Sequence, residues 1–258
     1  MVNLLLKNKT IAITGGTKGL GRDLALCCAY AGANVSITGR SEKDGKEIAE
    51  EINKKLPGKA IYIKSDLSDI KEIENFITET VRYYGEIDGL VNYAGYLLIS
   101  SIIDTEESLF DEAFNINIKA AFFCTKFALI SMIKNGGGSI VNIGSVHAYG
   151  GDEDRAAYAV SKGALLALNR YVARNYAKYN IRANWITMGW VPTPGEIELR
   201  ASQGKDLKWL KSTAKKVIPM GRMQTNKDHI PTIINLLSDQ SSQLTGSEIH
   251  ITGGLTLR

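Results

Sequence analysis

The sequence of 258 residues contains little proline and little cysteine, with five residues of the first and three of the second. The cysteines are Cys27, Cys28 and Cys124, an odd number that includes two chain neighbours and no Cys-x-x-Cys spacing. This pattern argues against a disulfide framework and against a zinc site. We therefore expect buried thiols in a reducing compartment, which favours a cytoplasmic protein, and we expect no metal site.

Long apolar runs and a strong charge are also absent. Residues 1–7 are too short an apolar run for a signal peptide, and Lys126 interrupts the best candidate for a membrane span, Ala120–Ile133. The net charge of +4 is small and evenly spread, which argues against nucleic-acid binding. Because 44% of the residues are hydrophobic, the chain is not expected to be disordered. The sequence thus predicts a soluble globular protein with no membrane and no nucleic acid as partner.

Glycine, by contrast, is abundant, with 25 residues, which indicates a backbone that must turn tightly or approach another group closely. Short apolar segments alternate with longer amphipathic ones, as in repeated strand–helix–strand units around a parallel sheet. Several short segments are apolar at nearly every position, which is typical of strands covered on both faces. The predicted strands are Thr10–Thr14, Asn34–Thr38, Ala60–Lys64, Gly89–Asn92, Ser139–Ile143, Arg182–Ile186 and Glu248–Ile251. The predicted helices include Gly21–Ala31, Glu42–Lys55, Ile70–Tyr84, Leu109–Lys134 and Ala157–Lys178.

These segments predict an α/β fold, a Rossmann-like doubly wound parallel sheet of about seven strands with helices on both faces. No linker divides the alternation, so residues 1–258 are expected to form a single domain. The segment 192–219 departs from the rhythm because it is long, polar and bracketed by prolines, and we interpret it as a lid over a substrate. Its five lysines indicate either a solvated helix face or a surface that attracts an anionic substrate.

A glycine-rich turn, Thr14–Gly21, follows the first predicted strand and opens a helix. In this position, unpaired backbone N–H groups and the positive end of the helix dipole face an anion, and glycines let a pyrophosphate come close. The turn therefore predicts a dinucleotide site in this domain. Its spacing is Gly-x-x-x-Gly-x-Gly, which differs from the commoner Gly-x-Gly-x-x-Gly.

The end of the second strand indicates which dinucleotide is bound. NAD sites commonly place a carboxylate there, but this chain has Arg40 and no acid until Glu42. Arg40 is suited to bidentate contact with a phosphate, and Lys18 supplies a second cation. We therefore expect NADP(H) rather than NAD(H), the alternative being that Arg40 is a solvated loop residue.

Tyr158 and Lys162 are four residues apart, on one face of a predicted helix. A phenol titrates near pH 10 and needs help to act as an acid or base at neutral pH. A neighbouring ammonium stabilises the phenolate and lowers its pKa. An isolated pair of this kind is usually structural, so its meaning depends on the rest of the sequence.

With these motifs in order, the sequence resembles the compact single-domain form of the short-chain dehydrogenase/reductase family, from about Lys9 to Gly254. The matches are the Thr-Gly-x-x-x-Gly-x-Gly turn, the Tyr-x-x-x-Lys pair, Ser145 at a strand end, the helix asparagine Asn117, Asp66-Leu67, and the turn Asn92–Gly95. The resemblance implies hydride transfer between a nicotinamide and a carbonyl or alcohol carbon. It also implies a homotetramer, with the faces of Leu109–Lys134 and Ala157–Lys178 available for pairing.

The resemblance assigns roles residue by residue. Tyr158 would be the proton donor or acceptor, Ser145 would hold the substrate oxygen, Lys162 would lower the tyrosine pKa and bind the nicotinamide ribose, and Asn117 would hold a water in a proton relay. The residues expected to bind the cofactor are Gly15, Thr17, Lys18, Gly19, Leu20, Gly21, Arg40, Asp66, Leu67, Asn92, Ala94, Gly95, Tyr158, Lys162, Gly189, Val191 and Thr193.

The chain departs from the family pattern at two positions. Tyr93 replaces the second asparagine of an Asn-Asn-Ala-Gly turn, and Met188 replaces the proline before Gly189. We expect altered local bracing at the first position and a less rigid turn at the second. Neither change removes a catalytic group.

The substrate is less well indicated. His147, Tyr149 and Trp190, with the charged residues 152–155 and Glu196, predict a polar pocket rim with aromatic faces. A rim of this kind favours a small polar substrate such as a sugar or polyol, because a steroid or long acyl chain needs an apolar lining. The alternative is that His147 and residues 152–155 are solvated.

Three other functions are alternatives to a dehydrogenase that acts on a small polar substrate. The lid lysines would suit the carrier-bound substrate of a 3-oxoacyl-thioester (acyl carrier protein) reductase. A nucleotide-binding regulator that has lost catalysis would be of another class, but the intact Ser145, Tyr158, Lys162 and Asn117 argue against it. A sugar-nucleotide epimerase needs a sizeable C-terminal substrate domain, for which the chain has no room.

Overall fold

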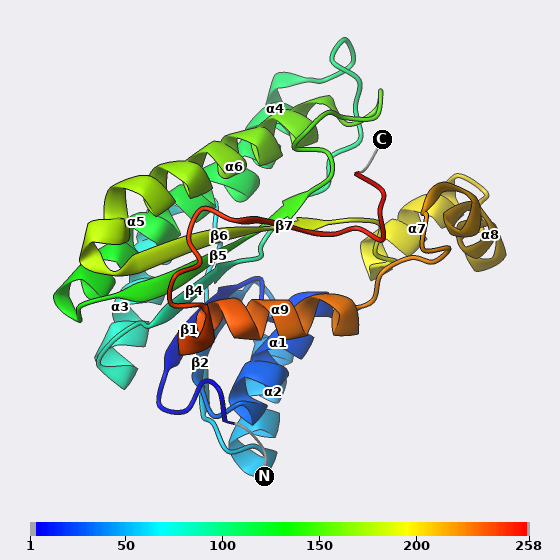
Figure 1. Cartoon of the computed structure of the whole chain (residues 1–258). Helices are drawn as coiled ribbons and strands as arrows, with labels where there is room; N and C mark the ends of the chain where they lie inside the picture. The colour runs from blue at the N-terminus through cyan, green and yellow to red at the C-terminus, as the bar shows by residue number, and fades with distance from the viewer. Residues whose placement is uncertain (1–3, 257–258) are drawn as a thin grey trace.

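The computed structural model describes residues 4–256, in which seven strands form one parallel sheet between two layers of helices (Figure 1). The strand order is β3-β2-β1-β4-β5-β6-β7. The strands are β1 (Thr10–Thr14), β2 (Asn34–Gly39), β3 (Ala60–Lys64), β4 (Gly89–Asn92), β5 (Gly138–Ser145), β6 (Ile181–Met188) and β7 (Glu248–Ile251). This confirms the predicted Rossmann-like doubly wound sheet, and the observed strand ends differ from the predicted ones by at most two residues.

Two layers of helices cover the sheet (Figure 1). The first layer consists of α1 (Gly19–Tyr30), α2 (Glu42–Lys55) and α9 (Asn226–Leu237). The second consists of α3 (Ile70–Tyr84), α5 (Ala120–Lys134) and α6 (Ala156–Tyr176), with α4 (Glu107–Phe114) leading into α5 through the π-helical turn Asn115–Lys119. Short 3₁₀ turns follow α6 (Ala177–Tyr179) and α9 (Asp239–Ser241).

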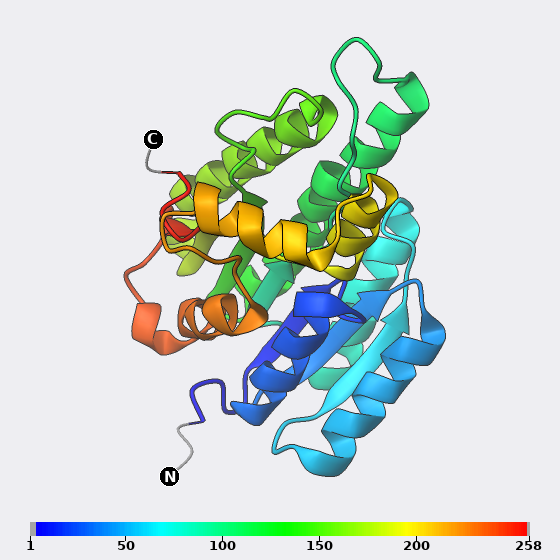
Figure 2. The same ribbon diagram turned by 90° about the vertical axis from the view of Figure 1, so that its right-hand side faces the viewer.

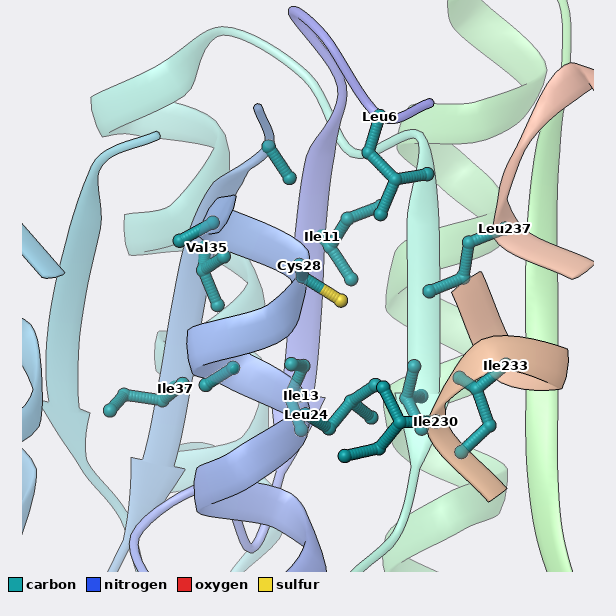
Figure 3. Packing of buried hydrophobic residues seen from close by; sticks show 14 of the residues in the cluster. Leu6, Ile11, Ile13, Leu24, Cys28, Val35, Ile37, Ile230, Ile233 and Leu237 are labelled. Atoms are coloured by element: carbon teal, nitrogen blue, oxygen red, sulfur yellow. The ribbon is translucent and has the colours of Figure 1, made fainter. Parts of the chain in front are cut away.

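Strand β1 explains why the sheet must be covered on both faces. All five of its residues are buried. Ile11 and Ile13 pack with α1 and α9, while Ala12 lies on the other face, in the cluster formed with α3 and α5. Figure 3 shows Ile11 and Ile13 in one packed group with Leu24 of α1 and with Ile230 and Ile233 of α9. Each fully buried Leu or Ile side chain stabilises the fold by about 1.5–3 kcal/mol.

Helix α9 was not anticipated by the sequence analysis. It begins with a capping box between Thr225 and Asp228, and it contains Pro231 in its interior. A proline inside a helix removes one backbone hydrogen bond, so local propensity argues against a helix here. Burial of its apolar face, Ile230, Ile233, Leu236 and Leu237, outweighs that cost.

The helical stretch 107–134 is longer than the apolar run considered in the sequence. By length and composition alone it is the one stretch among the described residues that is able to cross a membrane. The same test is passed by core helices, so it is weak evidence for a span. Here α5 packs on α3 and on the sheet, and the π-helical turn packs on α6.

The predicted lid segment forms two helices, α7 (Pro194–Ser202) and α8 (Leu207–Val217). They follow the carboxyl end of β6 and stand apart from the two layers (Figure 1). In the view of Figure 2 they lie in front of the sheet. The segment is therefore placed at the edge of the sheet where the predicted site residues converge.

Candidate active site

The predicted residues lie around the carboxyl ends of β1, β4 and β5. In the sheet, β1 lies between β2 and β4. Strands β2 and β3 extend the sheet on one side of β1 and β4 to β7 extend it on the other, so the strand order reverses between β1 and β4. Open α/β sheets bind their ligands in the crevice at such a point. Ser145 is the last residue of β5, and Asn92 is the last residue of β4.

The glycine turn has the backbone that only glycine accommodates. Gly15 and Gly19 have φ angles of +69° and +54°. A Cβ on Gly21 would overlap the carbonyl oxygen of Gly15, so the start of α1 lies directly against the turn. The first N–H groups of α1 are thereby brought to the crevice, which fits the pyrophosphate of a dinucleotide.

Thr14 holds the turn to the end of β4. Its hydroxyl donates to the carbonyl oxygen of Val91 (3.3 Å) and accepts from the N–H groups of Tyr93 (3.0 Å) and Ala94 (3.1 Å). Thr14 is the first residue of the Thr-Gly-x-x-x-Gly-x-Gly turn, and the sequence indicates no role for its side chain. The structure assigns it the joining of two adjacent strand ends.

Asn92 points into the protein rather than toward the crevice. Its amide nitrogen donates to Thr125 Oγ1 (3.1 Å) and to Asn142 Oδ1 (2.8 Å), and Asn142 donates in turn to Asn169 (3.0 Å). The side chain of Asn92 therefore braces β4 against β5 and α5. Its role as a cofactor ligand stays a prediction.

Tyr93 packs beneath the glycine turn. Its ring would clash with a Cβ on Gly21, and its hydroxyl receives the N–H groups of Leu20 and Gly21. Burial raises the pKa of Tyr93, and these two N–H groups lower it in part. The altered bracing expected at this position is thus a contact with the start of α1.

The end of β2 carries the residues predicted to select the cofactor. Gly39 has no room for a Cβ, which would lie 2.7 Å from Thr17 Oγ1. Arg40 is exposed and forms no ion pair with any residue in 4–256. Lys18 is instead paired with Asp44 (3.2 Å), an acid of α2 that the sequence analysis did not consider.

Asp66 and Leu67 follow β3 at the outer side of the same edge. Leu67 is buried, and Asp66 is exposed and accepts from the N–H and hydroxyl of Ser68. These hydrogen bonds lower the pKa of Asp66, and the charge of Arg40 lowers it further. Arg40 and Asp66 therefore face the same region.

Ser145, Tyr158 and Lys162 are brought together at the carboxyl end of β5. Lys162 is buried, and its ammonium donates to the carbonyl oxygen of Ile143 (2.9 Å) and lies 5.8 Å from the centre of the Tyr158 ring. Ser145 lies near enough to the Tyr158 phenol for its hydroxyl to lower the phenol pKa. The predicted catalytic residues thus share one place, as the motif spacing requires.

The pKa values of the two titratable groups are shifted by burial. Burial raises the pKa of Tyr158, while the Ser145 hydrogen bond and the charge of Arg155 lower it. Burial lowers the pKa of Lys162 to about 8. That Lys162 lowers the pKa of Tyr158 stays a prediction.

Asn117 lies in the π-helical turn before α5 and is buried. Its amide oxygen accepts from Tyr96 N–H (2.7 Å), and its amide nitrogen donates to Tyr96 O (2.9 Å) and Ser161 Oγ (2.9 Å). The Ser161 hydroxyl donates to the carbonyl oxygen of Tyr158 (2.7 Å). The Asn117 side chain therefore ties the loop after β4 to α6. Its role in holding a relay water stays a prediction.

The loop after β6 was expected to contact the nicotinamide. A Cβ on Gly189 would lie 2.5 Å from Gln224 Oε1, so the loop packs tightly there. Val191 is half-buried, and Thr193 caps α7 by accepting from Glu196 N–H (3.2 Å). The hydroxyl of Thr193, a residue expected to bind the cofactor, is engaged in this cap.

The three predicted substrate residues separate into two groups. His147 packs edge-on against Tyr158, with ring centres 5.8 Å apart, and Trp190 donates to Glu196 Oε1 (2.8 Å) at the base of α7. Tyr149 instead directs its hydroxyl to Glu248 of β7 (2.7 Å) and packs on His250. The structure does not bring Tyr149 to the catalytic group, because Glu248 and Thr187 engage its hydroxyl.

The sequence is similar to known proteins over nearly its whole length. A family model described as enoyl-(acyl carrier protein) reductase matches residues 15–256. An uncharacterised oxidoreductase of Thermotoga maritima is 36% identical over 97% of this chain and 98% of its own. A 3-oxoacyl-[acyl-carrier-protein] reductase FabG of the same organism is 32% identical over 98% and 99%.

Two further similarities bear on the substrate and the fold. A 2-keto-3-deoxy-L-fuconate dehydrogenase of Xanthomonas campestris is 32% identical over 98% of this chain and 81% of its own. A solved structure from Sinorhizobium meliloti 1021, a candidate short-chain alcohol dehydrogenase, superposes with a TM-score of 0.91 at 29% identity and covers 99% of both chains.

Proposed function

The chain belongs to the short-chain dehydrogenase/reductase family, and we propose that it uses NADP(H) to interconvert a carbonyl group and a secondary alcohol on a small polar substrate. The family uses nicotinamide cofactors, which supply or accept the hydride when bound. The proposal is supported chiefly by one observation: Ser145, Tyr158 and Lys162 lie together at the edge of the sheet that carries the glycine turn.

Each residue has a role that follows from its position. Tyr158 gives a proton to the alkoxide oxygen in reduction and takes it back in oxidation. Ser145, which lies near the phenol, holds the substrate oxygen beside it. Lys162 is the buried cation next to the ring and holds the nicotinamide ribose. Asn117 keeps α6 and the loop after β4 in register through Ser161 and Tyr96.

Substitution of the phenol tests the mechanism. We expect Tyr158→Phe to lower kcat/KM by about 10²–10⁴-fold, because a positioned acid or base contributes about that much. The cofactor Kd should change little. Tyr83→Phe, at an exposed tyrosine of α3, is the matched control and should retain full activity. Turnover by Tyr158→Phe at the wild-type rate would refute the mechanism.

The preference for NADP(H) rests on Arg40, which is exposed and unpaired within residues 4–256, while Lys18 is neutralised by Asp44. Arg40→Gln should weaken NADPH binding by about 10–100-fold, since a charged hydrogen bond contributes about 1.5–3 kcal/mol. NADH binding should stay the same, and Lys43→Gln on the exposed face of α2 is the control. Fluorescence titration measures both affinities, and tighter NADH binding by the wild type would contradict the preference.

A small polar substrate is favoured by the charged and aromatic groups near Tyr158. His147 packs against the Tyr158 ring. Glu196, which is paired with Arg200 (2.8 Å), lies close enough for its charge to raise the pKa of His147. The alternative is a 3-oxoacyl thioester on an acyl carrier protein, favoured by the FabG relative and by the lysines of α8. Rates with sugars, polyols, simple alcohols and 3-oxoacyl thioesters, each with both cofactors, distinguish the two substrate classes.

We also propose that the enzyme is a homotetramer. Phe122 and Ile130 on α5, and Val160 and Tyr171 on α6, are exposed apolar side chains on two helices of one layer. Burial of this surface between copies would stabilise the assembly. Light scattering should give about four times 28.2 kDa. Ile130→Lys should reduce the mass, whereas Ile103→Lys, in the loop before α4, should not.

We place the enzyme in the cytoplasm, where its thiols would stay reduced. Cys27, Cys28 and Cys124 are free, and burial raises the pKa of all three. Thiols protonated in this way react slowly. Cell fractionation with an antibody to the chain tests the location, and recovery in a periplasmic or membrane fraction would contradict it.

A further inference from the structure

Arg155 is a buried cation beside the catalytic tyrosine. It lies directly before α6, and only 3% of its surface is exposed, whereas Asp152 and Glu153 of the same charged segment are exposed. The backbone of this segment pairs with Ser100, which donates to Asp154 O (3.0 Å) and accepts from Ala156 N–H (3.1 Å). The alternative, in which residues 152–155 are all solvated, is therefore wrong for Arg155.

The guanidinium is only partly paired. Its Nη1 donates to the carbonyl oxygen (3.0 Å) and to the carboxylate (2.9 Å) of Asp154. Nε and Nη2 form no hydrogen bond with the part of the chain that the structure describes. Asp154 itself is 48% exposed, so water weakens its hold on Arg155. These two nitrogens are therefore free to donate to an anion, for which a guanidinium is well suited.

The charge of Arg155 acts on the site. Arg155 is the N-cap residue of α6 and Tyr158 is the third residue of that helix, and the side chains at these two positions approach each other at a helix start. The Arg155 charge lowers the pKa of Tyr158 and that of His147, and the rings of these two residues pack together. Arg155 and His147 therefore both lie in the neighbourhood of the Tyr158 phenol.

We propose that Arg155 binds a carboxylate of the substrate, so that the enzyme acts on a small hydroxy or keto acid of the polyhydroxylated kind. A guanidinium has two parallel N–H donors that match a carboxylate, and a cation buried beside Tyr158 selects such an acid over the corresponding neutral polyol. This inference rests on the proposed function and deepens it, since it names the group that fixes the substrate relative to the phenol.

The test compares matched acids and alcohols with variants at two adjacent positions. The probes are gluconate with sorbitol and glycerate with glycerol, each with NADP⁺ and NAD⁺, and binding to the enzyme–cofactor complex is followed by thermal shift as well as turnover. The wild type should prefer the acid of at least one pair by about tenfold or more in kcat/KM. Arg155→Gln should raise KM for that acid by about 30-fold while KM for the alcohol changes little. Any fall in kcat that follows from the loss of the Arg155 charge near Tyr158 should be the same for the acid and the alcohol. Arg155→Lys should recover part of the affinity.

Asp154→Asn separates substrate binding from a structural ion pair. If Arg155 serves only to hold Asp154, both substitutions should impair the enzyme alike, for acids and alcohols equally. If Arg155 binds the substrate, Asp154→Asn should leave the KM for the acid unchanged or lower it, because a competing carboxylate has been removed.

The outcomes also distinguish this inference from the proposed function. Equal use of acids and alcohols, or no binding of any acid probe, overturns the role of Arg155 even if an alcohol or carbonyl is still turned over. Turnover that survives Tyr158→Phe overturns the catalytic mechanism instead. A preference for 3-oxoacyl thioesters overturns the acid substrate and supports the alternative.

Discussion

The protonation state of Tyr158 determines how the rates of reduction and oxidation depend on pH. Burial raises its pKa, so at neutral pH the free group is a phenol, the form that reduction needs. Alcohol oxidation needs the phenolate, and its kcat/KM should rise with pH through the neutral range. The Ser145 hydrogen bond and the charge of Arg155 limit the increase in pKa.

The Ser145 hydrogen bond can be tested through this profile. In Ser145→Ala the phenolate loses a donor, so we expect the oxidation profile to shift to higher pH, in addition to a fall in rate of about 10²–10³-fold. The measurement is kcat/KM for oxidation against pH at saturating cofactor. Ser212→Ala, on α8, is the control. An unshifted profile would mean that Ser145 does not act on the Tyr158 pKa.

Gly144, next to Ser145, has no space for a side chain. A Cβ there would overlap the ring of the fully buried Trp185. We predict that Gly144→Ala lowers the free energy of unfolding by about 1–3 kcal/mol and displaces Ser145, since overpacking moves the backbone. Urea denaturation and kcat measure the two effects. Gly163→Ala, whose Cβ would have its nearest neighbour at 3.8 Å, should be neutral or stabilising.

Helix α9 carries a pH-sensitive contribution to stability. His229 is fully buried, and neither ring nitrogen has a hydrogen-bond partner within residues 4–256. Burial lowers its pKa to about 4 despite the charge of Asp228. The unfolded chain, with a histidine pKa near 6.5, binds this proton first as the pH falls. The free energy of unfolding should therefore decrease by about 1–2 kcal/mol between pH 7 and pH 5 through this residue. Below pH 4 both states are protonated and no further loss follows.

Denaturation of His229→Leu at the two pH values isolates this contribution. The difference between wild type and variant should change by that amount, whereas His250→Gln, on β7, should follow the wild type. If the wild type and His229→Leu lose equal stability between pH 7 and pH 5, the histidine is not the cause.

The lid segment is held at its base by one carboxylate. Glu196 is buried and accepts from both Trp190 Nε1 and Arg200 Nε, each at 2.8 Å. Glu196→Gln removes the charge that pairs with Arg200, and we expect KM to rise about 3–10-fold as α7 docks less firmly. Glu198→Gln, on the exposed face of α7, is the control. Limited proteolysis should cut residues 194–217 faster in the Glu196 variant, and equal cleavage would argue against a lid role.

The cofactor should stabilise the chain as one unit. The glycine turn, Arg40, Lys162 and the loop after β6 come from both halves of the sheet, so a ligand that contacts them all couples the halves. At 100 times its Kd, NADPH should add about 2.7 kcal/mol to the free energy of unfolding and raise a single Tm. Calorimetry measures this, with Arg40→Gln as control. Two transitions, of which only one shifts, would contradict a single domain.

The sequence by itself determined what depends on short spacings. The alternation of apolar segments predicted each strand to within two residues, because burial on both faces imposes a local composition. The glycine turn and the pair Tyr158 and Lys162 identified the site for the same reason, since both lie within a few residues of chain. Helix α9 was not predicted, because Pro231 argues locally against a helix and its apolar face is stabilised by partners that are distant in the sequence.

The tertiary structure alone settled which side chains are engaged and which are free. Asn92 turns inward to Asn142, Lys18 pairs with Asp44, and Tyr149 is directed to Glu248. Arg155, one of four consecutive charged residues, is buried beside Tyr158 although its neighbours are exposed. These outcomes depend on contacts between residues far apart in the chain, and no local pattern encodes them, because burial and pairing are properties of the packed molecule.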